Sequence, residues 1–398
     1  MQVNKSHQSV VLEKEAAKKL KFGKNSGFKT ELKRRVDELF QNPDRKARDC
    51  PQMYAKTIIL LFSFFGLYSL LVLVAQTWWQ VIPLCIMLGV VTAGIGFGIQ
   101  HDGAHHAYSD SLWVNKLMAM SLDLIGGSSY LWHWKHDVLH HTYTNIAGYD
   151  KDLDVGIFGR LSPSHPHLAF HRWQHYYLWL LYGFLAIKWH FYDDFYCLIA
   201  GKIGDRRYPR PKSSNLVIFF GGKLVFFALA FVIPLQFHGL WQVLASYGLV
   251  AFTLGVVLSV VFQLAHVVEE ADFPLPIAEL SLIEKDWAVH QLETTINFSR
   301  NNHFMTWFMG GLNFQIEHHL FPNICHINYP EISKIVEHTC REYGVRYNQH
   351  ISFWSGLSSH YRWLRKMGTT FRFFEPFSAR AIDNGSDAPG TILNDCSE

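Results

Sequence analysis

The sequence is poor in charged residues and lacks paired cysteines. Charged residues make up 17% of its 398 residues, below the ~25% usual for soluble domains, which favours a membrane protein. The six cysteines form no CxxC pair and show no even spacing, so we expect reduced thiols and neither a disulfide framework nor a zinc site. The net charge of +3 gives no sign of a nucleic-acid partner. No apolar run occurs in the first thirty residues, so we predict no signal peptide.

Four apolar runs are each long enough to cross a bilayer. They cover about residues 54–75, 81–99, 216–235 and 240–265, and each is close to the ~20 residues that a ~30 Å hydrocarbon core requires. A buried core helix is the alternative for a single run, but four runs in two pairs favour membrane spans. Lys223 interrupts the third run, and we expect its long stem to carry the ammonium group to the near interface.

The connections within the two pairs predict the topology. Residues 76–80 and 236–239 are short links without Lys or Arg, rich in aromatic residues that suit a membrane interface. Each pair is therefore predicted to be a hairpin, which returns the N-terminal arm, segment 100–214 and segment 266–398 to one face. Lys and Arg are frequent in the first fifty residues, so this face, with both termini, is predicted to be cytoplasmic.

We expect three parts in the chain: a basic cytosolic N-terminal arm (1–50), a membrane domain (51–376) and a polar, disordered C-terminal tail (377–398). The aromatic-rich segment 176–187 is predicted to be a helix lying on the membrane surface. A fifth span is the alternative, but it would place the histidine-rich segments on opposite sides of the bilayer. The expected fold is an all-α integral membrane protein, with four transmembrane helices in two hairpins and a cytosolic helical cap.

Histidine is abundant and clustered. The chain has 23 histidines, and the pattern HxxxHH occurs twice, as HDGAHH at 101–106 and HDVLHH at 136–141. Composition alone predicts about 0.08 occurrences of this pattern, so its repetition is specific. A third cluster, QIEHHL, lies at 315–320. These three motifs are the candidate site.

The spacing within the motifs suits metal binding. Residues i and i+4 lie on one face of a helix, so two imidazoles can meet one ion. His101 and His105 directly follow the second span, and His136 and His140 repeat their spacing. Eight clustered histidines are enough for two metal ions, so we predict a di-metal site in the cap. The candidate ligands are His101, His105, His136, His140, His141, His266, His318 and His319.

Other residues of the motifs are weaker candidates. His106 diverges from His105 by about 100° on a helix, which points the two rings apart. Asp102, Asp137 and Glu317 either orient ligand rings through the second ring nitrogen or face solvent.

A structural zinc site needs only four ligands and usually includes cysteine. Imidazole also suits iron, copper and nickel, and a histidine-dominated site beside a membrane favours redox iron handling oxygen.

The remaining histidines are expected to have other roles. A lone HxxxH pair is expected ~1.3 times in so histidine-rich a chain, so the spaced residues His167, His171 and His175 are assigned to packing or the surface. Four more histidines lie near the motifs and are predicted to be neighbours rather than ligands, of which His290 is the strongest candidate: His133, His290, His303 and His326.

The ordered motifs HDGAH, HDVLHH and QIEHHLFP on a two-hairpin scaffold resemble the membrane fatty acid desaturases. Shared context includes YTN at 143–145, DKDLD at 150–154, TTINF at 294–298 and GGLNFQIEHHLFPNICHINYP at 310–330. The resemblance covers roughly residues 30–370. The glutamine that opens the third motif is similar to that of front-end and sphingolipid desaturases and related acyl-CoA desaturases.

The resemblance implies a cytosolic di-iron centre, with two Fe²⁺ ions held by the eight histidines above and O₂ as co-substrate. His266 matches the ligand that the fourth span supplies. Many relatives have histidine where this chain has Gln315, which then binds weakly, acts through water or only forms a hydrogen bond. The implied reaction introduces a double bond into a fatty acyl chain carried by CoA or a membrane lipid.

The resemblance also implies an external source of two electrons. The chain contains no HPGG motif, and about fifty residues precede the first span, too few for a fused cytochrome b5 domain. We therefore expect a separate donor, either ferredoxin or cytochrome b5 with its reductase.

An apolar channel must hold the acyl chain, and aromatic residues near the motifs either line it or pack the core: Trp132, Trp134, Trp307 and Phe308.

Two other functions are alternatives to desaturation. A fatty acyl or alkane hydroxylase would use the same metals, but its product gains one oxygen instead of losing two hydrogens. A membrane metal transporter requires ionisable ligands near the bilayer midplane. The four runs here contain no acidic residue, and the histidine motifs lie outside them, which argues against transport.

Overall fold

The computed structural model describes residues 19–24, 27–277 and 280–370. Within these residues, four helices are long and apolar enough to cross a membrane: Pro51–Val74, Trp78–Ala104, Ser214–Gln236 and Leu240–His266. The four predicted spans are confirmed, and the second helix continues into the first histidine motif. The rest of the described chain is mostly short helices, so the all-α class is confirmed.

Three of the four long helices each contain one turn of π-helix. α3 (Pro51–Ser69) ends in one at Leu70–Val74, and α13 (Ser214–Phe227) ends in one at Ala228–Val232. The helical segments of the second span are α4 (Trp78–Ile95), a π-turn (Gly96–Gln100) and α5 (His101–Ala104). Such turns often occur at functional sites, and this one directly precedes His101. α14 (Leu240–His266) is one unbroken helix.

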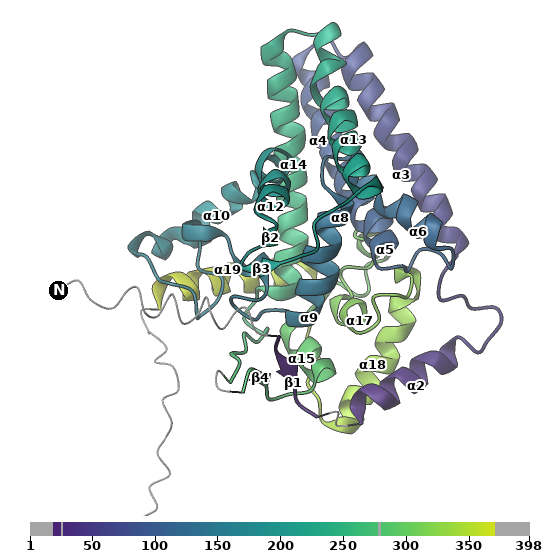
Figure 1. The fold of residues 1–398 in the computed structure, drawn as a ribbon, viewed down its shortest axis with the longest axis vertical. Helices are drawn as coiled ribbons and strands as arrows, with labels where there is room; N and C mark the ends of the chain where they lie inside the picture. The colour runs from purple at the N-terminus through teal and green to yellow at the C-terminus, as the bar shows by residue number, and fades with distance from the viewer. Residues whose placement is uncertain (1–18, 25–26, 278–279, 371–398) are drawn as a thin grey trace, which may run out of the picture.

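The long helices stand together at one end of the molecule, and the shorter elements gather at the other (Figure 1). α4 and α14 pack closely, because a Cβ atom on Gly89 of α4 would lie 2.7 Å from the Val250 carbonyl oxygen of α14. The outer faces of the long helices expose large apolar side chains such as Phe62, Val217 and Trp241. An exposed apolar surface of this kind suits contact with lipid.

The expectation that Lys223 in the third span reaches the membrane interface is wrong. Its side chain is buried, and its Nζ donates to Asp194 Oδ2 at 2.7 Å and to the Gly126 carbonyl at 2.6 Å. Asp194 begins α12 (Asp194–Ala200) in the cap. The lysine therefore forms an internal ion pair that ties the third span to the cap.

The cap contains short helices and three two-stranded sheets. β1 (Lys21–Phe22) pairs in parallel with β4 (Leu282–Ile283), β2 (Lys202–Ile203) pairs antiparallel with β3 (Arg206–Arg207), and β5 (Asn297–Phe298) pairs in parallel with β6 (Gln349–His350). Besides α12, the helices between and after the spans include α6 (Leu112–Ala119), α7 (Ser121–Leu124), α8 (Ser129–Trp132), a π-helix (His133–His140), α9 (His141–Tyr143), α15 (Trp287–Thr294), α16 (His303–Phe308), α17 (Gln315–Leu320), α18 (Tyr329–Tyr343) and α19 (Phe353–Thr369).

Segment 176–187 does not add a span. It forms α10 (Gln174–Tyr182) and α11 (Leu185–Lys188), whose buried residues include Leu178 and Tyr182. Figure 1 shows α10 extending sideways from the bundle of long helices. This orientation agrees with a helix running along a membrane surface.

Part of the N-terminal arm belongs to the folded body. α2 (Phe28–Leu39) buries Phe28, Leu32 and Val36 in a hydrophobic cluster with residues of α15, α17 and α18. Residues 1–18 and the predicted C-terminal tail at 377–398 lie outside the described residues.

Candidate metal centre

The second span delivers the first two imidazoles. His101 opens α5 and His105 follows its last residue, one helical turn later. Their ring centroids are 4.8 Å apart, and both residues are buried. The predicted i, i+4 pair therefore presents both rings to the same space.

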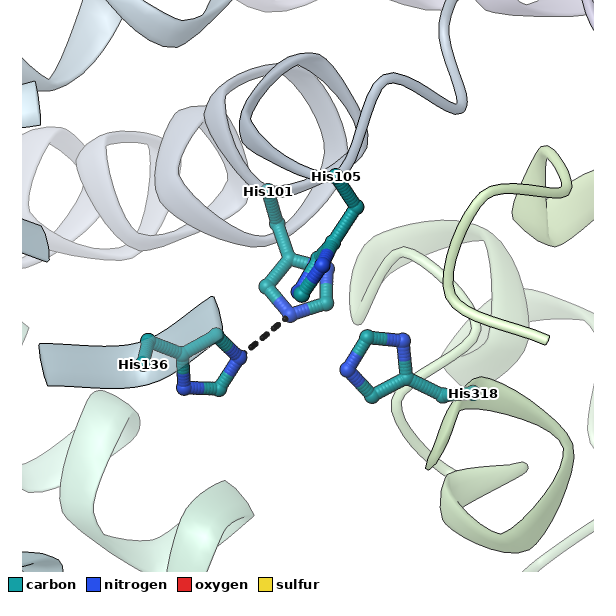
Figure 2. A group of neighbouring side chains, drawn as sticks. All are labelled: His101, His105, His136 and His318. Carbon is teal, nitrogen blue, oxygen red and sulfur yellow. Dashed lines mark hydrogen bonds between the residues drawn. The ribbon is translucent and has the colours of Figure 1, made fainter. Parts of the chain in front are cut away.

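A first group of imidazoles combines four histidines from three separate segments. The metal-binding atoms of His101, His105, His136 and His318 all lie within 4.8 Å of one another. Figure 2 shows these rings pointing toward a common centre, with His101 Nε2 only 3.2 Å from His136 Nε2. All four are buried, so this group can hold a metal ion away from bulk water.

A second group lies beside the first. His140, His266 and His319 place their metal-binding atoms within 4.8 Å of one another, and all three are buried. His266 ends the fourth span, so both hairpins contribute. His141 lies between the groups: its ring stacks on His319 at 4.2 Å and lies 4.5 Å from the ring of His318.

Several of these rings are held by one nitrogen and open at the other. His140 Nδ1 lies 3.0 Å from Asp150 Oδ2, and His319 Nδ1 lies 2.8 Å from Gln291 Oε1. Among the described residues, the Nε2 atoms of His140, His318 and His319 have no hydrogen-bond partner. A buried polar atom without a partner is costly, and a metal ion would satisfy these three. The outer bonds fix the ring orientation, as is usual for metal-binding histidines.

Burial keeps most of these imidazoles neutral, which is the form that binds metal. Burial, followed by the neighbouring imidazoles, holds the pKa values of His136, His141, His318 and His319 well below the ordinary value. His140 differs: burial opposes its charged form, but Asp150 outweighs this and raises its pKa. Burial therefore favours the neutral form of these four imidazoles, whereas Asp150 favours the protonated form of His140.

His106 and Gln315, the two less certain candidate ligands, lie in different surroundings. His106 is exposed with a positive φ of 57°, and the structure does not place it in either group. Gln315 is buried at the start of α17, where its Nε2 lies 2.9 Å from His266 Nε2. Its side chain thus borders the second group.

The three acidic residues of the motifs have separate partners. Asp137 Oδ2 lies 2.8 Å from His133 Nδ1, and its Oδ1 approaches His105 Nε2 at 3.5 Å without a hydrogen bond. Asp102 pairs instead with His326, 2.9 Å from Nδ1. Glu317 is buried, and it accepts hydrogen bonds from Asn297 and Tyr347.

The structure adds supporting residues that the sequence did not single out as contacts. Asp150 and Gln291 hold His140 and His319, and the Tyr329 hydroxyl lies 3.3 Å from His318 Nδ1. Asp150 lies in the DKDLD segment and Tyr329 in the segment 310–330, but neither has a spacing that links it to a histidine. The signal was available only as the resemblance of these segments.

The remaining histidines lie outside both groups. His290 is buried against the Phe22 ring at 5.2 Å, and His303 is exposed. His167 and His171 lie within hydrogen-bond distance of the backbone carbonyls of Gly368 and Ile157. These positions agree with the packing and neighbour roles predicted for them.

Trp132 stacks against the first group. Its ring stacks on His136 at 4.6 Å and on Trp189 at 5.6 Å. Trp307 and Phe308 pack instead in hydrophobic clusters around the long helices. One apolar wall of the centre is therefore formed by Trp132.

Comparison with known proteins gives the family. Residues 77–351 match the fatty acid desaturase family. The chain is 39% identical over 354 residues to the sn-1 linoleoyl-lipid 6-desaturase of Synechocystis sp., covering 88% of this chain and 98% of that one. The enzyme of the same name from Arthrospira platensis is also 39% identical, covering 88% and 95%. An acyl-lipid (8-3)-desaturase of Physcomitrium patens is 37% identical, covering 87% of this chain and 72% of its own. With two buried histidine groups beside four membrane-type helices, the chain belongs to the fatty acid desaturase family and is an oxidoreductase acting on fatty acids.

Proposed function

We propose that this enzyme uses two iron ions, O₂ and two external electrons to place a double bond in an acyl chain of a membrane lipid. The observation that carries the proposal is the pairing of two adjacent imidazole groups whose open nitrogens face inward. The relatives named as lipid desaturases support a membrane lipid as the acyl carrier, in preference to CoA. The proposed ligands are His101, His105, His136, His140, His141, His266, His318 and His319.

The iron centre would supply the O₂-dependent oxidation that removes two hydrogens from adjacent methylenes. The balance is one O₂, two electrons and two protons consumed per double bond, with two waters released. The protein's part is to position the reactants and keep water out. Trp132, stacked on His136 and on Trp189, forms part of the apolar surroundings of the first group.

The chain's own residues set the geometry of the centre. Asp150 and Gln291 fix the planes of His140 and His319 through their outer nitrogens. Gln315 occupies a position beside His266 where its amide can contact either the second ion or a water on it. Because the surrounding imidazoles are buried and neutral, the site favours metal over protons.

We also propose that the site and the described N-terminal elements face the cytoplasm. The links between paired spans carry no Lys or Arg, whereas Lys and Arg are frequent in the first fifty residues, the distribution typical of cytoplasmic segments. Electrons would come from a separate carrier protein on that side, either ferredoxin or cytochrome b5 with its reductase.

Expression in a host of known lipid content tests the reaction. We expect new fatty acids two mass units lighter than their precursors, with a defined double-bond position, and iron in the purified enzyme. His318→Ala should lose both iron and product, because its Nε2 points into the first group. His106→Ala is the matched control, since this exposed histidine lies outside both groups.

Products sixteen mass units heavier would identify a hydroxylase instead. An unchanged fatty acid profile from an iron-loaded enzyme with a working electron donor would reject the proposed reaction. Full iron content in His318→Ala would reject the ligand assignment.

A further inference from the structure

One surface of the cap carries an excess of positive charge. Residues 19–30 contain four lysines and no acidic residue. All four are exposed, and within the described part of the chain none of them forms an ion pair with an acidic residue. We call this surface the basic face; it consists of Lys19, Lys21, Lys24 and Lys29.

The basic face is connected to α15, a helix that contacts the candidate metal centre. β1, which carries Lys21, pairs with β4, and α15 follows β4 after a short turn. The acids nearby leave the charge excess in place, because Glu293 is already paired with Lys285 at 2.5 Å. Only Glu284 adds an exposed negative charge on this connection.

This face lies far from the membrane. In Figure 1, β1 and α15 lie at the end of the molecule opposite the outer ends of the long helices, below α9 and α17. A bilayer around the long helices would not reach these lysines. The charge therefore suits a partner that approaches from the aqueous side and not a lipid headgroup.

Trp287 connects the basic face to the centre. The residue is half-buried in the first turn of α15, and Lys29 Nζ lies 4.1 Å above its ring. On the inner side, its indole Nε1 donates to the carbonyl of His141 at 3.3 Å. The same helix reaches the second group through Gln291, 2.8 Å from His319. The Trp287 side chain therefore contacts Lys29 of the basic face on one side and the backbone of the candidate ligand His141 on the other.

We propose that the basic face docks an acidic, one-electron carrier protein and that its electrons enter the centre through Trp287. The inference rests on the proposed function, which requires two electrons per double bond. In each step the reduced carrier loses one electron and the metal centre gains one, with no bond made or broken. Two such steps supply one turnover.

Charge complementarity accounts for recognition by this face. Charged patches raise association rates and make them sensitive to salt. A small acidic carrier, such as a plant-type ferredoxin or the soluble domain of cytochrome b5, has the required charge. Either would bring its redox group against the half-buried edge of Trp287.

The first experiment measures docking. The detergent-purified, iron-loaded enzyme is titrated with a plant-type ferredoxin and, separately, with a soluble cytochrome b5 domain, at low and high salt. Lys21→Glu/Lys29→Glu should weaken binding of the accepted carrier about tenfold at low salt and flatten its salt dependence. Lys366→Glu, exposed on α19 away from this face, is the matched control and should bind normally.

The second experiment measures electron transfer by rapid mixing with the reduced carrier. Trp287→Leu should leave the dissociation constant unchanged but slow reduction of the iron, and Trp287→Phe should fall between Leu and the natural residue. Both Trp287 variants lose the hydrogen bond to His141, so slower reduction in Trp287→Leu than in Trp287→Phe reports the aromatic ring itself. Chemically reduced Lys21→Glu/Lys29→Glu enzyme should form product at the normal rate, because both lysines are exposed and outside the two histidine groups.

Three results would overturn the inference. Unchanged carrier binding in Lys21→Glu/Lys29→Glu would place docking elsewhere. A loss of binding to vesicles with anionic lipid, with carrier binding intact, would assign the face to membranes. Equal reduction rates in Trp287→Leu would remove Trp287 from the route. Failure of the chemically reduced natural enzyme to desaturate would instead reject the proposed function.

Discussion

The candidate ligands differ in what holds their outer nitrogen. His140 has a carboxylate, His319 has an amide, and His318 faces the hydroxyl of Tyr329. A carboxylate both orients the ring and makes the other nitrogen more basic. The pair of His140 with Asp150 should therefore contribute most to metal retention in the second group.

Replacing Asp150 with asparagine tests this ranking. Asp150→Asn keeps an oxygen for His140 and for the backbone N–H of Asn145, but removes the negative charge. We expect iron affinity to fall about tenfold or more, as for other outer partners of metal-binding histidines. The measurement is iron content after dialysis against graded chelator. Asp154→Asn, at a half-exposed site outside both groups, is the control; equal retention in both variants would contradict the ranking.

Sequence spacing identified the imidazoles but not their partners. The HxxxHH spacing correctly placed His101 and His105 in one group by local helix geometry. His136 and His140 lie instead on a π-helix (His133–His140) and belong to the first and the second group, respectively. The acids depend on tertiary contacts: Asp102 meets His326, 224 residues away, and Glu317 meets Asn297 and Tyr347. Asp137 bonds to His133, one helical turn away, and approaches the candidate ligand His105 only to 3.5 Å. Partners of this kind follow from the fold and have no periodic signal.

At the scale of elements, a buried ion pair joins the third span to the cap. Lys223 and Asp194 are about 95% buried, with side-chain exposures of 4% and 5%. Breaking such a pair by removing one partner is costly, because the other charge stays buried. Burial already raises the pKa of Asp194, although Lys223 acts against this.

Removing the ammonium group alone should destabilise this junction. We expect Lys223→Met to lower the free energy of unfolding by roughly 3–5 kcal/mol, because Asp194 is left unpaired. Lys223→Met/Asp194→Leu should recover most of the loss, since both charges are then gone. The measurement is the thermal midpoint of the purified enzyme in detergent. Lys188→Met, which removes an exposed pairing with Asp193, is the control; a midpoint for Lys223→Met matching this control would contradict the prediction.

Hydropathy predicted the spans well and their ends less well. The second helix runs to Ala104, beyond the apolar end at 99, which confirms that the first histidine motif begins on a continuation of this helix, and a π-turn at Gly96–Gln100 lies within it. Hydropathy has no signal for a π-turn. The position of Lys223 was also missed, since composition does not show that Asp194 and the Gly126 carbonyl lie beside it.

At the scale of the whole molecule, two hairpins bring distant segments to one side. The first motif follows the second span, His266 ends the fourth, and the remaining motifs lie in the cap. The two histidine groups can form only if the chain returns to the same side of the membrane between the motifs, which requires an even number of spans between them. The links at the opposite end, at 75–77 and 237–239, must then lie across the bilayer from the cap.

Matched cysteine labelling tests this arrangement. Gln76 and Gln41 are both exposed, the first in the link between α3 and α4 and the second after α2 in the cap. A membrane-impermeant thiol reagent added to intact cells should label Gln76→Cys, whereas Gln41→Cys should be labelled only after lysis. The unsubstituted protein sets the background, because the described native cysteines are buried or half-buried. Labelling of Gln41→Cys but not of Gln76→Cys in intact cells would invert the proposed orientation. Equal labelling of both variants in intact cells would break the two-hairpin topology on which the shared metal centre depends.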